Sequence, residues 1–362
     1  MNNNRGIIGI IEDEVKLRGA MPFARFMELA LYCPNIGYYE CAEQSPGRKG
    51  DYFTSVSVGS LFGELLAHRF AGWLVALPQG KRQILEAGAH DGQLALDMLR
   101  RFKTHRPDVL DSLEYWILEP SVIRRQFQER TLAEFQGRVR WFDRWAALPP
   151  GGVRGVIFSN ELLDAMPVHR LGWDAARGKW FEWGIALENG RFVWTKLKTI
   201  EAGVPVPILP NELLAVLPDG FSTEVCPAAT DWWRRAAQTL REGKLLAFDY
   251  GLSAEQFFTP ERRDGTLRAY HQHHATRDIL ERAGEQDITA SVNFTAIQNA
   301  GESAGLVTET FANQAQFLTD IVGALANEPR FNEWFSPLTR QFQTLTHPEH
   351  LGQSFRVLVQ TR

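Results

Sequence analysis

Short apolar runs alternate with amphipathic segments through most of this chain. The runs that predict buried strands begin at Gln83 and Glu114 and continue at residues 139–142, 153–159, 244–250 and 354–360. Helical periodicity separates several of them, most clearly over residues 232–240 and 317–325. Strands that alternate with helices in this way predict an α/β fold, a Rossmann-like doubly wound and mainly parallel sheet.

Residues 168–200 depart from this pattern. They alternate aromatic with polar residues and carry turn sequences at 176–178 and 188–190, which predicts an inserted antiparallel hairpin. Residues 105–112 lack a clear pattern and are expected to form a loop extension before the second strand.

The first eighty residues form an N-terminal helical extension in this interpretation, with helices over 23–32 and 61–77 and a connection rich in glycine and tyrosine between them. The predicted organisation is an N-terminal helical region with a lid loop at 1–80 and a Rossmann-like domain at 81–362, with insertions at about 168–225 and 251–300.

The first predicted strand runs into a turn that contains Glu86, Gly88 and Gly92. The dinucleotide fingerprint G-x-G-x-x-G would need glycines where this chain has His90 and Gln93, so that reading fails. A looser pattern remains, an acid followed by glycines, in which backbone approaches a nucleotide-like ligand closely. A tight turn that binds nothing is the alternative.

Glu119 closes the second predicted strand, just before Pro120 and Ser121. A carboxylate in this place can accept both hydroxyls of a ribose, as in other nucleotide-binding sheets. The alternative is a strand-end acid that pairs with Arg124. The two strand-end acids together favour a nucleoside site.

Composition is that of an ordinary globular enzyme. The chain has 362 residues, 44% hydrophobic and 23% charged, with a net charge of −4. This balance gives no basic field, so no nucleic acid partner is expected. No apolar run approaches the roughly 18 residues of a membrane span.

Cys33, Cys41 and Cys226 are sparse, odd in number and lack C-x-x-C spacing. They indicate reduced thiols and a cytoplasmic location. No metal is expected, because the histidines at 271, 273 and 274 lack ligand spacing and have no cysteine nearby. A homodimer is left open.

Several local sequences together resemble one family, the MidA-like class I S-adenosylmethionine-dependent methyltransferases, which are related to a mitochondrial assembly factor of respiratory complex I. The segments that carry the resemblance lie in order along the chain, at 21–32, 37–39, 50–55, 61–66, 159–168, 264–270 and 287–295. The resemblance implies S-adenosyl-L-methionine as cofactor and, in the mitochondrial branch, a protein arginine as acceptor.

Cofactor contacts are expected from the residues of the first turn, Glu86, Gly88, His90 and Gly92, and from Glu119 on the ribose. Asp143 follows the third strand and is expected near adenine, or else is a solvated loop acid. A polar loop at 50–55 suggests a lid over the nucleoside, with contacts from Asp51 and Thr54.

Catalysis is assigned to the end of the fourth strand, where ligands of such sheets bind. Glu161 is the first choice for a carboxylate that binds the acceptor, and Asn160 can orient acceptor or cofactor. If residues 161–165 form a helical turn, Asp164 shares a face with Glu161; otherwise it caps or pairs within the turn before Pro167.

Three functions stay open at this point. The first is a methyltransferase that acts on a protein side chain. The second is a non-catalytic assembly protein of the same fold, which His90 and Asp91 in the glycine turn favour. The third is a methyltransferase for a small-molecule acceptor, with the 168–200 insertion as a roof over the site.

Overall fold

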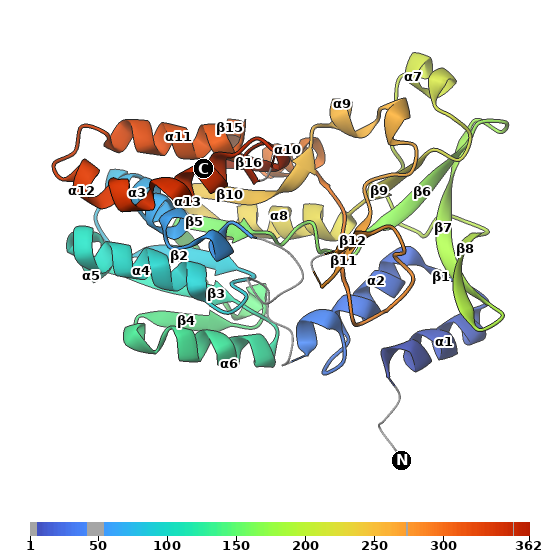
Figure 1. The fold of residues 1–362 in the computed structure, drawn as a ribbon, viewed down its shortest axis with the longest axis horizontal. Coiled ribbons are helices and arrows are strands. Elements are labelled where there is room, and N and C mark those ends of the chain that lie inside the picture. Colours follow the sequence, from blue (N-terminus) through green and yellow to red (C-terminus); the bar gives the residue numbers. More distant parts are fainter. Residues whose placement is uncertain (1–5, 42–53, 273, 350) are drawn as a thin grey trace.

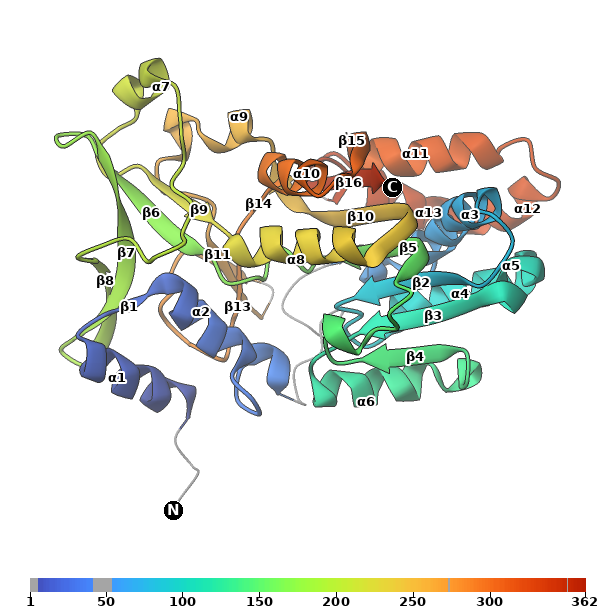
Figure 2. The ribbon, with the colours of Figure 1, turned by 180° about the vertical axis from the view of Figure 1, so that it is seen from behind.

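The structure is a computed structural model that describes residues 6–41, 54–272, 274–349 and 351–362. A large sheet with helices on both faces lies beside smaller antiparallel sheets and the N-terminal helices (Figure 1). The view from behind shows the same two halves, with helix α8 crossing toward the smaller sheets (Figure 2).

The large sheet confirms the Rossmann-like prediction. Its strand order is β15-β16-β10-β5-β2-β3-β4, and β4, β3, β2, β5 and β10 run parallel. The strands are β2 (Arg82–Ala87), β3 (Leu113–Leu118), β4 (Val139–Phe142), β5 (Val153–Asn160), β10 (Leu240–Leu252), β15 (Val307–Asn313) and β16 (Phe355–Thr361), and the short β14 (Val292–Asn293) pairs with β10.

Three details differ from the sequence expectation. Strand β16 runs antiparallel to both of its neighbours, whereas a parallel strand was expected at 354–360. Strand β15 was not predicted, because its residues are exposed or half-buried in alternation and form no apolar run. The expected loop at 105–112 contains helix α5 (Pro107–Ser112), which begins at a proline, a residue that suits the first helical position.

Helices pack on both faces of the sheet because their apolar sides match the two buried faces of its strands. One face carries α3 (Leu61–Ala76), α4 (Gln93–His105), α5, α11 (Gln314–Leu325), α13 (Thr339–Thr346) and α14 (Leu351–Ser354). The other face carries α8 (Pro227–Thr239) and α10 (Phe294–Ser303). Helix α6 (Val122–Thr131) contacts α4, and α12 (Phe331–Phe335) precedes α13.

The predicted insertion forms antiparallel strands, which confirms the hairpin. Asn189 and Gly190 turn the chain with positive φ angles of 50° and 76°. The strands of this sheet are β1 (Met21–Pro22), β6 (His169–Asp174), β7 (Lys179–Glu188), β8 (Arg191–Lys196) and β9 (Ser222–Val225).

The N-terminal helices α1 (Ile7–Arg18) and α2 (Phe23–Tyr32) share an apolar core with this small sheet. The remaining elements are α7 (Asn211–Val216), α9 (Ala254–Phe257) and a sheet of β11 (Arg268–His271), β12 (His274–Thr276) and β13 (Asp287–Thr289). No helix in the described ranges has both the length and the apolar composition to cross a membrane.

Candidate active site

A cavity of about 800 Å³ opens at the carboxyl ends of the parallel strands, between the large sheet and the N-terminal segment. This is where ligands of open α/β sheets bind. The predicted residues that line it are Thr54, Glu86, Gly88, His90, Glu119, Asp143, Asn160 and Glu161. Gly92 and Asp164 do not line it, and Asp51 lies outside the described residues.

The turn after β2 requires its glycines. Gly88 and Gly92 have φ angles of 71° and 86°, in the left-handed region that favours glycine. A Cβ on Gly88 would lie 2.8 Å from the Leu162 side chain. Gly92 begins helix α4, so its role is to turn the chain rather than to face the cavity.

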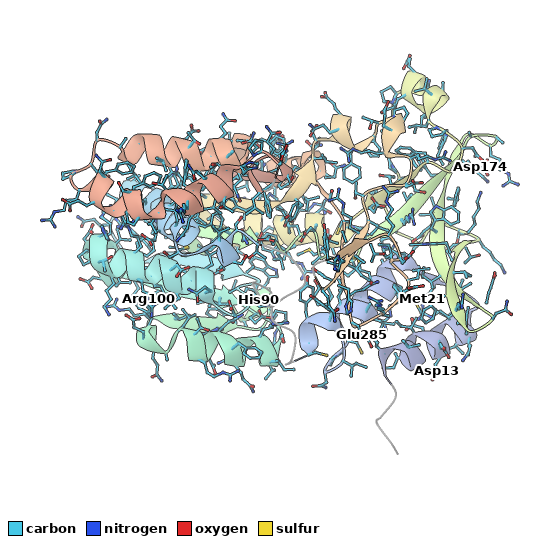
Figure 3. All side chains as sticks on the ribbon, in the orientation of Figure 1. Asp13, Met21, His90, Arg100, Asp174 and Glu285 are labelled. Carbon is cyan, nitrogen blue, oxygen red and sulfur yellow. The ribbon has the colours of Figure 1, made fainter. Side chains whose placement is uncertain are left out.

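His90 also has a positive φ, of 49°, and lies on the side of the large sheet that faces the smaller sheets (Figure 3). Its Nε2 lies 3.0 Å from Nη1 of Arg124, and its carbonyl oxygen accepts a hydrogen bond from Gln128. Burial lowers the pKa of His90, so the imidazole is neutral and can accept from the guanidinium. The His90 side chain is therefore held by Arg124 at the cavity wall.

Glu86 sits at the end of β2 and is buried. The Tyr115 hydroxyl donates a 2.6 Å hydrogen bond to its Oε2. Burial raises the pKa of Glu86 to about 7, although this hydrogen bond favours the ionised form. A cation in the cavity would stabilise the carboxylate.

Glu119 is held in place by its own loop and by α6. Its Oε1 accepts from the N–H of Ser121 and its Oε2 from Gln128, both at 2.9 Å. Burial raises the pKa of Glu119 to about 7, against these two hydrogen bonds. Each carboxylate oxygen has a second lone pair, so the group can still accept from two ribose hydroxyls.

Asp143 is exposed and pairs with Arg144 at 2.8 Å at the rim of the cavity. Beside it, Trp145 and Trp232 line the cavity with their rings edge to face, 5.6 Å between centroids. Two aromatic faces next to a hydrogen-bonding acid suit a purine base. Sequence reasoning missed both tryptophans. Trp145 lies only two residues after Asp143, whereas Trp232 comes from α8, far along the chain.

Asn160 is the last residue of β5, and Glu161 follows it directly. Glu161 takes a left-handed conformation, with φ of 53°, and its N–H donates to Phe248 at 2.9 Å. Its Oε1 accepts from the Asn160 amide at 3.1 Å, and the backbone N–H of Ser55 lies near enough to the carboxyl group to lower its pKa. Its Oε2 is buried and makes no hydrogen bond of ordinary length in the described part of the chain. Burial, and next the charge of Asp249, raise the pKa of Glu161 to about 8.

Residues 161–165 do not form a helical turn, which was one of the two possibilities for Asp164. The left-handed Glu161 cannot continue a helix, and the N–H groups of Leu162 and Leu163 donate instead to the Asp249 carboxylate. Asp164 therefore points away from the cavity and contacts Asp249, which places it behind Glu161 rather than beside it.

Two tyrosines of the N-terminal segment, which sequence reasoning missed as site residues, close the cavity opposite the sheet. Tyr32, in α2, and Tyr39, in η1 (Tyr38–Glu40), stack with centroids 5.5 Å apart and line the cavity. Tyr32 donates to the carbonyl of Ala165 at 2.9 Å, and Tyr39 donates to Asp287 at 2.7 Å. The Gly-Tyr-Tyr sequence at 37–39 was a signal, but only of the family.

Thr54 is the first described residue of the predicted lid loop at 50–55, because residues 50–53 lie outside the described part of the chain. Its hydroxyl accepts from the N–H of Ser57, and its own N–H donates to the Ser57 hydroxyl, both at 3.0 Å. This small turn presents Thr54 and Ser57 to the cavity.

A possible metal-ligand set lies elsewhere. Of the described residues, His169, Glu182 and Glu201 are the one group of three with ligand-type atoms close together, and none lines the cavity. His169 is already hydrogen-bonded to Glu182 at 2.7 Å, and Glu182 also accepts from the N–H of Glu201. We interpret the group as an internal hydrogen-bonded cluster.

Comparison with known proteins agrees with this geometry. The sequence profile of Methyltransf_28, a family of S-adenosyl-L-methionine-dependent methyltransferases, matches residues 65–312. This chain belongs to that family. The match confirms the resemblance to the MidA-like methyltransferases, and it makes the chain an S-adenosylmethionine-dependent enzyme.

Relatives and solved structures cover most of the chain. A COG1565 superfamily member from Burkholderia thailandensis, bound to S-adenosyl-homocysteine, is 32% identical over 98% of this chain and 92% of its own, with a TM-score of 0.83. The mitochondrial protein arginine methyltransferase NDUFAF7 homolog of Drosophila melanogaster is 26% identical over 94% of this chain and 81% of its own. The human NDUFAF7 is 24% identical over 94% and 80%.

The residues present fit S-adenosylmethionine. Two buried acids, Glu86 and Glu119, offer oxygen acceptors to an ammonium group and to ribose hydroxyls, and the turn at Gly88 exposes backbone to the same cavity. Asp143 and Trp145 line the rim of the same cavity, where they would contact adenine.

Proposed function

We propose that this enzyme methylates an arginine side chain of a protein. The observation that carries the proposal is the Glu161 carboxyl group, which lines the cavity with a buried, unsatisfied Oε2. Unsatisfied buried carboxyl oxygens are costly, and a guanidinium N–H is a donor that suits them.

Charge around Glu161 supports a cationic acceptor. Asp164, Asp249 and Asp287 are buried nearby, and their negative charges raise the pKa of Glu161 or of one another. A cluster of buried acids stabilises a cation that enters, and guanidinium keeps its charge at any physiological pH. The names of the Drosophila and human relatives, as protein arginine methyltransferases, agree with this choice.

The chain's own residues can handle the proton that methylation releases. S-adenosylmethionine, when bound, supplies a methyl group on an electrophilic sulfonium. Glu161 orients the guanidinium through hydrogen bonds and localises its charge away from the nitrogen that forms the new N–C bond. That nitrogen gives its proton to the Glu161 carboxylate, while the electrons of the broken C–S bond stay on sulfur.

The test uses lysate from cells that lack this gene, in which the natural acceptor is unmethylated. We expect the purified enzyme to transfer labelled methyl from S-adenosylmethionine to arginine in lysate proteins, identified by mass spectrometry. Glu161→Gln should lower this rate at least about 100-fold and leave the affinity for S-adenosylhomocysteine within about threefold.

Other results would redirect the proposal. A methylated product in the small-molecule fraction alone would identify a small-molecule methyltransferase. Cofactor binding without any transfer would favour an assembly protein. Transfer to arginine that Glu161→Gln leaves intact would contradict the role of Glu161.

Location and assembly stay predictions. Composition and cysteine usage favour the cytoplasm, whereas the animal relatives are named mitochondrial, and fractionation of cells would decide. A homodimer is tested by the mass of the protein in solution.

A further inference from the structure

The carboxylate of Asp249 lies behind the turn that carries Glu161. Asp249 is in β10, fully buried, and does not line the cavity. Its Oδ2 accepts from the N–H groups of Leu162 at 3.1 Å and Leu163 at 2.8 Å, and its Oδ1 accepts from the N–H of Tyr250 at 2.9 Å. One carboxylate thus satisfies three backbone donors, two of which belong to the turn.

This turn needs an external restraint. The left-handed conformation of Glu161 is unfavourable for a residue with a Cβ, so it persists only where the surroundings fix it. The N–H of Glu161 is held by Phe248 on one side, and Asp249 holds the next two N–H groups. Both restraints come from β10.

Asp249 also contacts Asp164, whose side chain is hydrogen-bonded to it. Two carboxyl groups can hydrogen-bond to each other only when one of them carries a proton. Burial, and next the charge of Asp249, raise the pKa of Asp164 well above its usual range, so Asp164 holds the proton and Asp249 carries the charge. The carbonyl of Asp164 accepts from the N–H of Ala290 at 2.9 Å.

We propose that Asp249 is a positioning residue of the acceptor site, which fixes the left-handed turn so that Glu161 faces the cavity. The role of Glu161 as acceptor carboxylate rests on the proposed function. The restraint that Asp249 places on the turn does not depend on the proposed function.

The charge behind Glu161 also makes it a better base. The groups that face it are Asp164, Asp249 and Asp287, with Tyr250, the neighbour of Asp249 in β10. After burial itself, the charge of Asp249 is the main cause that raises the pKa of Glu161 to about 8. Removal of that charge should lower the pKa of Glu161.

The first measurement is amide hydrogen exchange in Asp249→Asn, which needs no acceptor. The amide has a single oxygen acceptor, and its NH₂ group repels the N–H donors of the turn. We expect exchange at Leu162 and Leu163 to become at least about tenfold faster. The matched control is Glu224→Gln, a buried carboxyl group outside the cavity that accepts from the N–H and hydroxyl of Thr266, each at 2.8 Å.

The second measurement is the rate of methyl transfer into arginine of the deletion lysate, from pH 6 to 9. We expect Asp249→Asn to lower the rate by about 10- to 100-fold, with the affinity for S-adenosylhomocysteine within about threefold of wild type. The pH at which the rate rises should move down from near 8, because Glu161 ionises more easily. In Glu224→Gln the rate of methyl transfer should rise at the same pH as in the wild type.

Unchanged exchange at Leu162 and Leu163, or a rate within threefold at an unmoved pH, would overturn the proposal. If Asp249→Asn does not fold, Asp249→Ser keeps one acceptor oxygen and takes its place. Failure of both to fold would also overturn it, because Asp249 would then stabilise the domain and not one turn. A wild-type enzyme that methylates no arginine contradicts the proposed function. Amide hydrogen exchange at Leu162 and Leu163 would still test whether Asp249 restrains the turn.

Discussion

Glu86 is a carboxyl group whose charge depends on what enters the cavity. Its hydrogen-bond partner, Tyr115, is neutral, and burial raises the pKa of Glu86 to about 7. Near neutral pH it is therefore partly protonated in the free enzyme. A cationic ligand favours the carboxylate, so binding and ionisation are coupled.

The affinity for S-adenosylmethionine should therefore rise from pH 6 to pH 8. Tyr115→Phe removes the hydrogen bond that favours the carboxylate, and we expect about three- to tenfold weaker binding at pH 7, equivalent to about 1 kcal/mol. Calorimetry over this pH range checks both statements. If the affinity falls as pH rises, or if Tyr115→Phe keeps the wild-type affinity at every pH, Glu86 does not bind the cofactor.

The tryptophans at the rim give a second prediction at the residue scale. Trp145→Ala should weaken binding of S-adenosylhomocysteine about tenfold, because an adenine loses an aromatic neighbour. Trp183 is the matched control: it lies in β7, does not line the cavity, and donates to Ser222 at 3.2 Å. Equal losses in Trp183→Ala and Trp145→Ala would contradict an adenine site at Trp145.

At the scale of elements, the strand ends place the site. Strands β2, β3, β4 and β5 run parallel, so the residues after them meet at one edge of the sheet. The turn after β2 carries the tightest requirement, since Gly88 combines a positive φ with the Leu162 side chain close by.

Gly88→Ala should lower the free energy of unfolding by about 1–2 kcal/mol and weaken binding of S-adenosylhomocysteine at least tenfold. Gly190→Ala is the control, because Gly190 has a similar φ, of 76°, with open space around its Cβ position. Gly190→Ala should lose less stability, because only the positive φ opposes it, and it should keep the wild-type affinity for S-adenosylhomocysteine. The measurements are urea unfolding and calorimetry, and wild-type affinity in Gly88→Ala would contradict the assignment of this turn.

Local pattern was enough to predict the parallel strands and the residues that follow them, among them Glu86, Glu119 and Glu161. Local pattern could not predict the parts of the site that depend on contacts between residues far apart in the sequence. Tyr39 meets Asp287 across 248 positions, and Asp249 meets Leu162 across 87, so no short sequence indicates either contact. For the same reason the sequence could not decide whether residues 161–165 form a helical turn, since Asp249 of β10 accepts from the N–H groups of Leu162 and Leu163.

At the scale of the molecule, several buried acids oppose folding at high pH. Burial raises the pKa of Glu86 and Glu119 to about 7 and of Glu161 to about 8. Between an unfolded value near 4.5 and these values, the folded chain holds protons that the unfolded chain has lost. Stability therefore falls as pH rises through this window.

We expect the melting temperature of the ligand-free enzyme to fall from pH 5.5 to pH 8.5, and Glu161→Gln to make this fall smaller. His68 acts in the opposite sense, because burial and then Arg101 lower its pKa to about 3. Its contribution is present above about pH 6.5 and is lost as pH falls, by at most about 1.4 kcal/mol per pH unit. Thermal unfolding across pH checks this, and a melting temperature that rises from pH 5.5 to 8.5 would contradict it.

The most direct test of the whole account is a crystal structure with S-adenosylhomocysteine. We predict that the ligand occupies the cavity at the strand ends, with its ribose at Glu119, its adenine beside Trp145 and its sulfur on the side of Glu161. A ligand bound elsewhere, or a cavity closed to it while His90 stays on Arg124, would contradict the site described for this enzyme.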